Sequence, residues 1–285
     1  MSVYKAVISI STGLILLVGI LYFSFLRKND AAEITPSQEI IIEETWELPN
    51  ILEEVSGIAF LDDQRVACIQ DEDGTIFVYD LKASKIVEEI DFAGGGDYEA
   101  ISISENTAYV LRSDGTIFKI TQYLSNPVVT EHELPLKDDP DMEGMTWNSS
   151  SNKLWLVNKE KDANKSGFKS IYVVDPETMK LQEEPVYKIP LENAIFETEE
   201  EKESMEDLKP SELNIHPITG EIYVLEGHHP KLLVLDSDGN PKKLYILDSD
   251  NFPQPEGLAF DASGGMYISN EGNKATIHKI SIHKN

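Results

Sequence analysis

Cysteine is nearly absent from this chain of 285 residues. The one cysteine, Cys68, cannot form an internal disulfide, and it is compatible with either side of a membrane. Catalytic signatures are also lacking. The sequence has no G-x-S-x-G, no H-E-x-x-H and no glycine-rich phosphate loop, so none of the corresponding enzyme classes is indicated. Amphipathic helical periodicity is absent over most of the length, and short strand-like runs take its place.

Basic residues are scarce. The chain holds 24 Lys and Arg against 51 Asp and Glu, and every acidic residue follows Lys28. Because Lys5, Arg27 and Lys28 are three of the basic residues, the rest of the chain has a net charge of −30. Such a surface repels phosphate backbones and anionic lipid, which argues against nucleic acid as a partner. It favours cations, although solubility is the simpler reason for so many carboxylates.

Only one long hydrophobic run is present, at residues 6–26, and it contains no charge. About 20 apolar residues are enough to span a bilayer as a helix. A cleaved signal peptide is the alternative, but its apolar region is shorter, about 7–15 residues, and a small-residue cleavage site follows it. We therefore expect residues 1–28 to be an N-terminal transmembrane anchor and residues 29–38 to be a polar stalk. The flanking charges leave the orientation open.

The remainder, residues 39–285, repeats one pattern of three strands and turns. The first strand of each repeat begins VSGIAF, YEAISI, MEGMTW, PSELNI or PEGLAF, and Asp-Gly turns recur between strands. If Ser56, Glu99, Glu143, Ser211 and Glu256 are equivalent, the spacings are 43, 44, 68 and 45 residues. Four-stranded propeller blades recur at roughly 40–50 residues. We therefore expect an all-β fold, a five-bladed β-propeller, with six blades as the alternative.

Two details complete this prediction. The long spacing contains an acidic stretch with helix-forming composition, residues 192–207, which we interpret as an insertion between the third and fourth blades. The last repeat has only three strands, whereas residues 39–48 form a strand without a repeat of its own. We expect this early strand to complete the last blade and close the ring.

Polar side chains recur at the strand ends that face a propeller channel. One predicted ring is the set of five equivalent residues above, and a second comprises Asp71, Arg112, Asn158, Glu226 and Asn270. Carboxylate and amide oxygens are the ligands that calcium prefers, with six to eight per ion. The sequence therefore suggests a calcium site, with the metal ligands Glu99, Glu143, Glu256, Asn158, Asn270, Asp71 and Glu226. The alternative is an ordinary solvated channel in which Arg112 and Lys159 neutralise part of the charge.

The repeats carry a resemblance. EVSGIAF, QDEDGTIFVYDL, GDYEAISI, DMEGMTW and QPEGLAFD followed by MYISNEG resemble the SdiA-regulated (YjiK-like) family over about residues 43–280. The resemblance implies a propeller tethered to the bacterial inner (plasma) membrane and facing the periplasm or cell exterior, which settles the orientation. It makes bound calcium plausible and leaves the activity undefined. Ser56 and Ser211 depart from the glutamate pattern, so the ring of carboxylates is incomplete.

Two functions follow as hypotheses. The first is a binding or scaffold module that presents a propeller face to an envelope protein or a small ligand, because no nucleophile with an adjacent base can be identified. The alternative is a calcium-dependent hydrolase of the lactonase, esterase or phosphodiesterase type, in which a channel metal polarises a carbonyl or phosphoryl oxygen and a channel carboxylate or His228 is the base. An electron-transfer role lacks the cofactor-binding cysteines that it requires.

Overall fold

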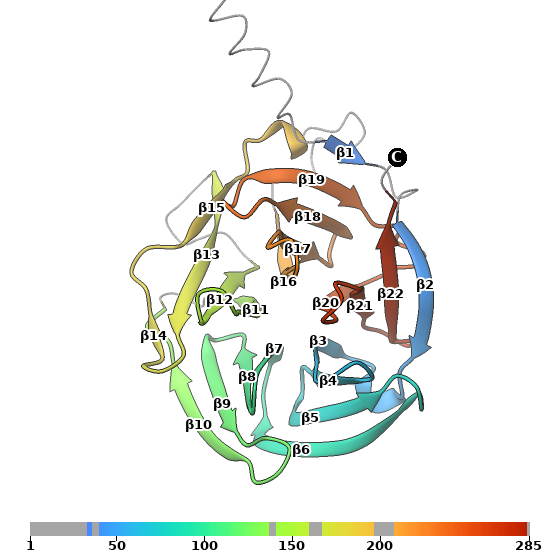
Figure 1. Cartoon of the computed structure of the whole chain (residues 1–285), viewed down its shortest axis with the longest axis vertical. Helices are drawn as coiled ribbons and strands as arrows, with labels where there is room; N and C mark the ends of the chain where they lie inside the picture. The colour runs from blue at the N-terminus through green and yellow to red at the C-terminus, as the bar shows by residue number, and fades with distance from the viewer. Residues whose placement is uncertain (1–32, 36–39, 137–140, 160–166, 197–207, 284–285) are drawn as a thin grey trace, which may run out of the picture.

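The fold was analysed in a computed structural model, which describes residues 33–35, 40–136, 141–159, 167–196 and 208–283. The described strands form five sheets, antiparallel apart from the short strand β1, that are arranged as the blades of a propeller (Figure 1). This confirms the predicted fold class and five as the number of blades. The innermost strands β3, β7, β11, β16 and β20 each contact the next around the ring, and β20 contacts β3 to close it.

Each blade runs outward from its innermost strand. The first comprises β3 (Val55–Phe60), β4 (Arg65–Gln70), β5 (Asp73–Asp80) and β6 (Lys85–Gly95). The second comprises β7 (Tyr98–Ser104), β8 (Thr107–Arg112), β9 (Thr116–Thr121) and β10 (Val128–Glu133). The third comprises β11 (Met142–Asn148), β12 (Lys153–Asn158) and β13 (Phe168–Asp175), and β13 pairs with two short strands, β14 (Lys180–Leu181) and β15 (Tyr187–Pro190).

The fourth blade comprises β16 (Pro210–Ile215), β17 (Ile222–Glu226), β18 (Lys231–Leu235) and β19 (Pro241–Ile246). A short strand, β1 (Glu33–Thr35), pairs with β19 in parallel. This strand lies within residues 29–38, for which the sequence predicts only a polar stalk. The fifth blade comprises β20 (Pro255–Phe260), β21 (Met266–Asn270) and β22 (Thr276–Ile282), and its outer strand is β2 (Ile40–Glu47).

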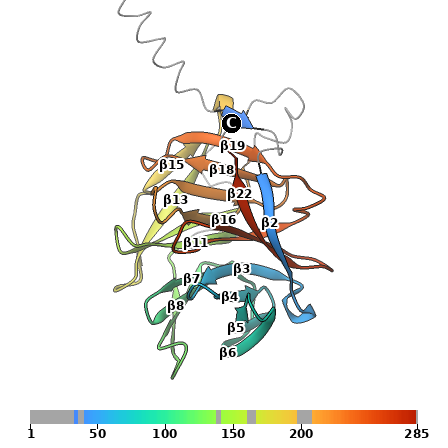
Figure 2. The ribbon, with the colours of Figure 1, turned by 45° about the vertical axis from the view of Figure 1, so that its right-hand side comes forward.

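The ring is closed by β2, as predicted. This strand pairs antiparallel with β22, so the outermost strand of the last blade comes from the start of the domain (Figures 1 and 2). A short 3-10 helix, η2 (Asn50–Leu52), follows it and leads into the first blade. Because β2 is hydrogen-bonded into the last blade and the chain continues from it into β3, the last blade is held to the first.

Both faces of every blade are buried, because neighbouring blades pack against each other. The structure has five buried hydrophobic clusters, one between each pair of adjacent blades. Alternate residues of one strand belong to different clusters: Val110 packs towards the first blade and Leu111 towards the third. A strand that is buried on both faces needs apolar residues at consecutive positions, which explains the continuous hydrophobic runs of the second strands.

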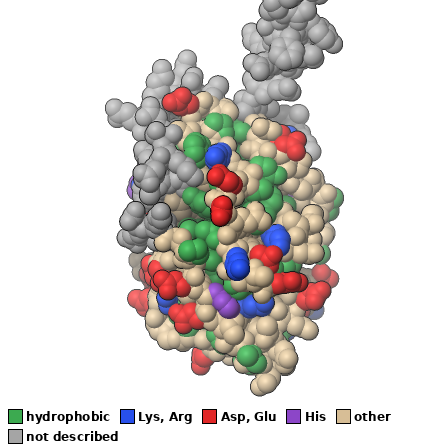
Figure 3. Space-filling model, turned by 90° about the vertical axis from the view of Figure 1, so that its left-hand side faces the viewer, with side chains coloured by type: hydrophobic (Ala, Val, Ile, Leu, Met, Phe, Trp, Pro, Cys, Tyr) green, Lys and Arg blue, Asp and Glu red, His purple; other side chains and the backbone are tan. Residues whose placement is uncertain are grey.

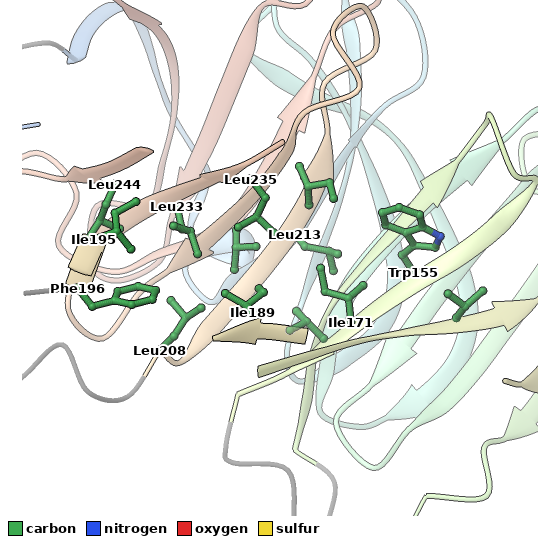
Figure 4. Close-up of a cluster of buried hydrophobic side chains, with 14 residues drawn as sticks. Trp155, Ile171, Ile189, Ile195, Phe196, Leu208, Leu213, Leu233, Leu235 and Leu244 are labelled. Carbon is green, nitrogen blue, oxygen red and sulfur yellow. The ribbon is translucent and has the colours of Figure 1, made fainter. Parts of the chain in front are cut away.

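The predicted insertion is described only in part. Ala194–Phe196 form a 3-10 helix, η3, and residues 197–207 lie outside the described part of the chain. Ile195 and Phe196 are buried in the cluster between the third and fourth blades, close to Leu208 (Figure 4). The start of the segment is therefore part of the core. The side of the ring in Figure 3 exposes acidic, basic and apolar side chains in a mixed arrangement.

Closure of the ring can be tested at Trp46 on β2. Its Nε1 donates a hydrogen bond to the Leu81 carbonyl oxygen at 2.8 Å, and its ring stacks on Tyr267. We predict that Trp46→Ala lowers the free energy of unfolding by about 3–5 kcal/mol, because it leaves a cavity between the first and fifth blades. Ile41→Ala on the same strand, at a half-exposed position, should cost less than about 1 kcal/mol. Urea denaturation followed by circular dichroism measures both, and equal losses would contradict a special role for Trp46.

Candidate functional site at the channel mouth

A β-bulge occurs at the start of all five innermost strands. In the third blade Met142 pairs with Asn158 and Gly144 with Val157, which leaves Glu143 as the extra residue. The same shift leaves Glu99 and Ser211 extra in the second and fourth blades. In the first and fifth blades one extra residue lies within 56–57 and 256–257. The five residues that the sequence predicts to form one ring therefore all lie at bulges. A bulge changes the direction in which a side chain points.

Glycine follows the bulge residue in three blades because the innermost strands approach each other closely. A Cβ atom on Gly57 would lie 2.9 Å from the backbone nitrogen of Ile101 on β7. A Cβ atom on Gly144 would lie 2.8 Å from the backbone nitrogen of Leu213 on β16. Only glycine tolerates such contacts with backbone. The Glu-Gly pair therefore has two roles: the glycine permits the strands to pack, and the glutamate stands at the channel mouth.

Lys159 neutralises part of the negative charge of the converging carboxylates. Lys159 Nζ lies 3.0 Å from Glu143 Oε1, and the Glu143 side chain is almost completely buried. Burial and the neighbouring Glu143 carboxylate raise the pKa of Glu99 far above its usual value. Burial also raises the pKa of Glu143, and Lys159 opposes that shift. The sequence allowed for neutralisation by Arg112 and Lys159: Lys159 forms this ion pair, whereas Arg112 pairs with Asp114 and Glu131.

Two more carboxyl groups share this environment. Burial, Glu271 and Glu143 raise the pKa of Glu256 to about 8. Burial, Glu54 and Asp71 raise the pKa of Glu271 to about 7, while Lys159 lowers it. Protons therefore remain on part of this cluster near neutral pH, because one ammonium group cannot balance all the carboxylates.

Two oxygens at this mouth have no hydrogen-bond donor within the described part of the chain. They are Oδ1 of Asp71 and Oδ1 of Asn270, and the Asn270 side chain is only 1% exposed. Asn270 Nδ2 lies 3.3 Å from Thr276 Oγ1, so the amide is held from one side. Together with the carboxylates, these two oxygens are ligands of the type that calcium prefers. Among the described residues, however, no three of His, Cys, Asp or Glu are grouped closely enough to hold a metal ion as they stand.

The second predicted ring needs one correction. Val55 pairs with Gln70, so Gln70 is the residue of the first blade that matches Arg112, Asn158, Glu226 and Asn270. Asp71 is one position further on, and its backbone N–H donates to Glu54 as that of Lys159 donates to Asp141. Glu271 makes the equivalent bond to Gln254. Asp71, Lys159 and Glu271 therefore belong to one ring.

Two other residues of the predicted second ring, Arg112 and Glu226, have partners that the sequence could not identify. Arg112 pairs with Asp114 at 2.8 Å and Glu131 at 3.6 Å. Glu226 is fully buried and pairs with Lys231 at 2.9 Å, on the side of β17 that faces the third blade. Glu226 is therefore a weaker candidate for a metal ligand than the channel glutamates, because its charge is already balanced. In the loop that follows β17, His229 Nδ1 lies 3.6 Å from Glu226 Oε1.

Sequence reasoning missed Glu212 and Glu271. Glu212 replaces the glycine of the Glu-Gly pair, and its Oε1 accepts hydrogen bonds from the backbone nitrogens of Met145 and Leu213. Burial raises its pKa well above the usual value. The fourth repeat begins P-S-E-L (residues 210–213), whereas the fifth begins P-E-G-L (residues 255–258). The acidic residue is thus shifted by one position in the fourth repeat, and this shift could have identified Glu212. For Glu271 the signal was its place directly after Asn270, as Lys159 follows Asn158.

Comparison with solved structures shows the same fold in proteins of different activity. The glutaminyl cyclase of Myxococcus xanthus is 13% identical with a TM-score of 0.61, and the match covers 88% of this chain and 98% of that one. A PQQ-bound aldose sugar dehydrogenase from Streptomyces coelicolor is 11% identical with a TM-score of 0.53, covering 86% and 98%. A streptogramin B lyase is 14% identical with a TM-score of 0.51, covering 87% and 99%. At these identities the likeness concerns the fold alone.

The sequence comparisons are more specific. No curated protein matches the chain. A family model described as SdiA-regulated matches residues 31–275, which include the first four blades and every strand of the fifth except β22. The resemblance drawn from the blade motifs is thereby confirmed, and the chain belongs to the SdiA-regulated family.

Proposed function

We propose that this protein is a binding module whose acidic channel mouth takes a divalent cation, with calcium as the ion that its oxygen donors favour. The observation that carries the proposal is an imbalance of charge. Glu99, Glu143, Glu256 and Glu271 share the ammonium group of Lys159, and among the described residues no group donates a hydrogen bond to the amide oxygen of buried Asn270. A cation would balance the carboxylates and give that oxygen a partner.

Lys159 explains why the carboxylates are not already grouped as a metal site. Its ammonium group contacts Glu143 and also acts on Glu256 and Glu99, so it occupies the position that a cation would take. Calcium binding then requires the ammonium group to move away. Lys159 is partly exposed, so its long side chain can turn into solvent without a large loss of packing.

Membrane attachment is the second part of the proposal. We place the anchor at residues 6–26 because this run of 21 residues has no charge and basic residues flank it. The anchor lies outside the described residues, and within them no helix is long and apolar enough to cross a membrane. The module would then stand on the periplasmic or outer side of the bacterial membrane and present its acidic mouth to an envelope protein or a small ligand.

Anchoring predicts a simple fractionation result. The full chain should remain with the membrane pellet after washing with high salt or alkaline carbonate, because the association is hydrophobic rather than electrostatic. A chain that starts at residue 29 should appear in the soluble fraction. Recovery of the full chain in the supernatant, or of a shortened chain cleaved after residue 26, would contradict an uncleaved anchor.

The cation site predicts opposite effects from two substitutions. Calorimetric titration of the purified protein with calcium should show binding, and Glu143→Gln should weaken it by at least about tenfold because a charged oxygen ligand is lost. Lys159→Met should strengthen it by about tenfold, because no ammonium group then competes for the carboxylates.

Lys153→Met is the matched control for the lysine. Lys153 is the first residue of β12, whereas Lys159 directly follows its last; Lys153 pairs with Asp175, and its removal changes the net charge equally. Its calcium affinity should equal that of the unmodified protein. If all three variants bind alike, calcium is held elsewhere; if none of the proteins binds calcium, the proposed function is wrong.

Stability should depend on pH in a direction set by the raised pKa values. Glu256 and Glu271 have pKa values of about 8 and about 7 when folded, against 4.5 normally, so the folded state favours their protonated forms. Their contribution to stability is complete below 4.5 and is lost as the pH rises through 7 and 8. The calcium-free protein should therefore melt at progressively lower temperature between about pH 5 and about pH 9.

Added calcium and Glu256→Gln test the cause of this trend. Saturating calcium should flatten the fall in melting temperature, because it stabilises the ionised carboxylates. Glu256→Gln should also flatten it, since the amide resembles the protonated acid. A melting temperature that rises over the same pH range without calcium would show that the carboxylates are not the groups that titrate.

A further inference from the structure

The opposite end of the channel contains a cavity of about 440 Å³, which the acidic site does not use. The five innermost strands begin at the carboxylates and end at this cavity, which is lined by the last residues of each. The turn between β16 and β17, residues 216–220, forms part of the wall. The size lies within the range of small-molecule sites, about 300–1,000 Å³.

The cavity differs from the rest of the molecule in its charge. None of the residues that line it is Asp, Glu, Lys or Arg, although 26% of the chain is charged. His216 is the one ionisable side chain among these described lining residues. A charged ligand that enters the cavity would lose its hydration shell and find no side chain of opposite charge in the lining. This transfer has an unfavourable free energy. The lining therefore selects an uncharged ligand.

Three polar side chains at the cavity have their acceptor atoms occupied by backbone N–H groups. Asn148 Oδ1 accepts from the nitrogens of Ser150 and Ser151 at 2.9 and 3.0 Å. His216 Nδ1 accepts from Ile218 and Thr219, both at 3.2 Å, which places the ring proton on Nε2.

Ser102 is the third, and its Oγ accepts from the nitrogen of Trp147 at 2.8 Å. The amide hydrogens of Asn148, the Nε2 proton of His216 and the hydroxyl hydrogen of Ser102 have no acceptor in the described part of the chain. The cavity thus offers neutral donors, and a ligand must bring acceptor oxygens to use them.

Apolar groups complete the lining. Trp147, Phe60 and Phe260 are all partly exposed, and Trp147 is held by parallel stacking on Tyr109. Ile218 at the cavity is 69% exposed, the highest value for a large hydrophobic residue in the described chain. Exposed aromatic and aliphatic side chains beside hydrogen-bond donors are a usual composition of ligand sites.

From these features we propose that the cavity is a second ligand site and that it binds a neutral saccharide. A pyranose ring has an apolar C–H face that can pack on an aromatic side chain, and several uncharged oxygens that accept hydrogen bonds. These are the complements of the aromatic walls and of the three donors. The proposal is independent of the cation site, because the two lie at opposite ends of the channel.

The test is a titration with neutral and charged sugars. Glucose, N-acetylglucosamine and maltose are the neutral probes, and glucuronate and glucosamine are charged analogues, each followed by calorimetry up to tens of millimolar. At least one neutral probe should bind, with an affinity at least about tenfold above that of its charged analogue. No binding by any neutral probe, or equal binding by charged ones, would overturn the proposal.

Paired variants locate the site. Ile218→Glu places a charge at the cavity and should weaken sugar binding at least about tenfold. Val128→Glu makes the same change at a position that is 51% exposed on the outer strand β10, and should bind as the unmodified protein does. Both residues are exposed, so melting temperatures should stay equal. Glu143→Gln at the other mouth should leave sugar binding unchanged. If Ile218→Glu binds sugar normally, the cavity is not the site.

Discussion

The close approach of five innermost strands is the constraint on which this structure depends. Gly57 and Gly144 face the backbone of the next strand at distances that exclude a Cβ atom. Packing of this kind leaves no room beside the backbone, so the extra residue in each bulge has its side chain directed elsewhere. The channel mouth is the space that remains. The common position of these side chains is therefore a consequence of how the strands pack, although Ser56 and Ser211 show that packing does not require a carboxylate there.

Electrostatics follows from the same geometry. Once bulges bring Glu99, Glu143 and Glu256 to one place, burial and mutual repulsion raise their pKa values, and only protons or cations relieve the repulsion. Lys159 supplies one positive charge from the third blade. In the fourth blade Ser211 stands at the bulge, and Glu212 accepts a hydrogen bond from the backbone of β11. The site is thus asymmetric although the fold repeats.

Sequence reasoning succeeded where one signal repeats and failed where blades differ in detail. Five entrance motifs, with three of their four spacings at 43–45 residues, predicted the fold, and a strand without its own repeat identified β2 as the closing strand. The register of the first blade was mistaken because Gln70 and Asp71 are adjacent polar residues, and only strand pairing separates them. Partners such as Lys231 for Glu226 come from the pairing of β17 with β18, which spacing alone does not reveal. The cavity was not predictable, since uncharged lining residues form no motif.

The two ends of the channel differ for a reason that lies in the chain direction of the strands. Every innermost strand carries its bulge at the first pairs, so ionisable residues collect at one mouth. The other ends of the same strands pair regularly, and their polar residues bond to neighbouring strands, as Thr146 does to Asn214 and Ser102 to Trp147. At Asn148, His216 and Ser102 the side-chain acceptor atoms are occupied by backbone N–H groups, and their donor groups face the cavity. One architecture thereby presents two distinct chemistries: buried carboxylates at the entrance, and neutral hydrogen-bond donors beside aromatic side chains at the exit.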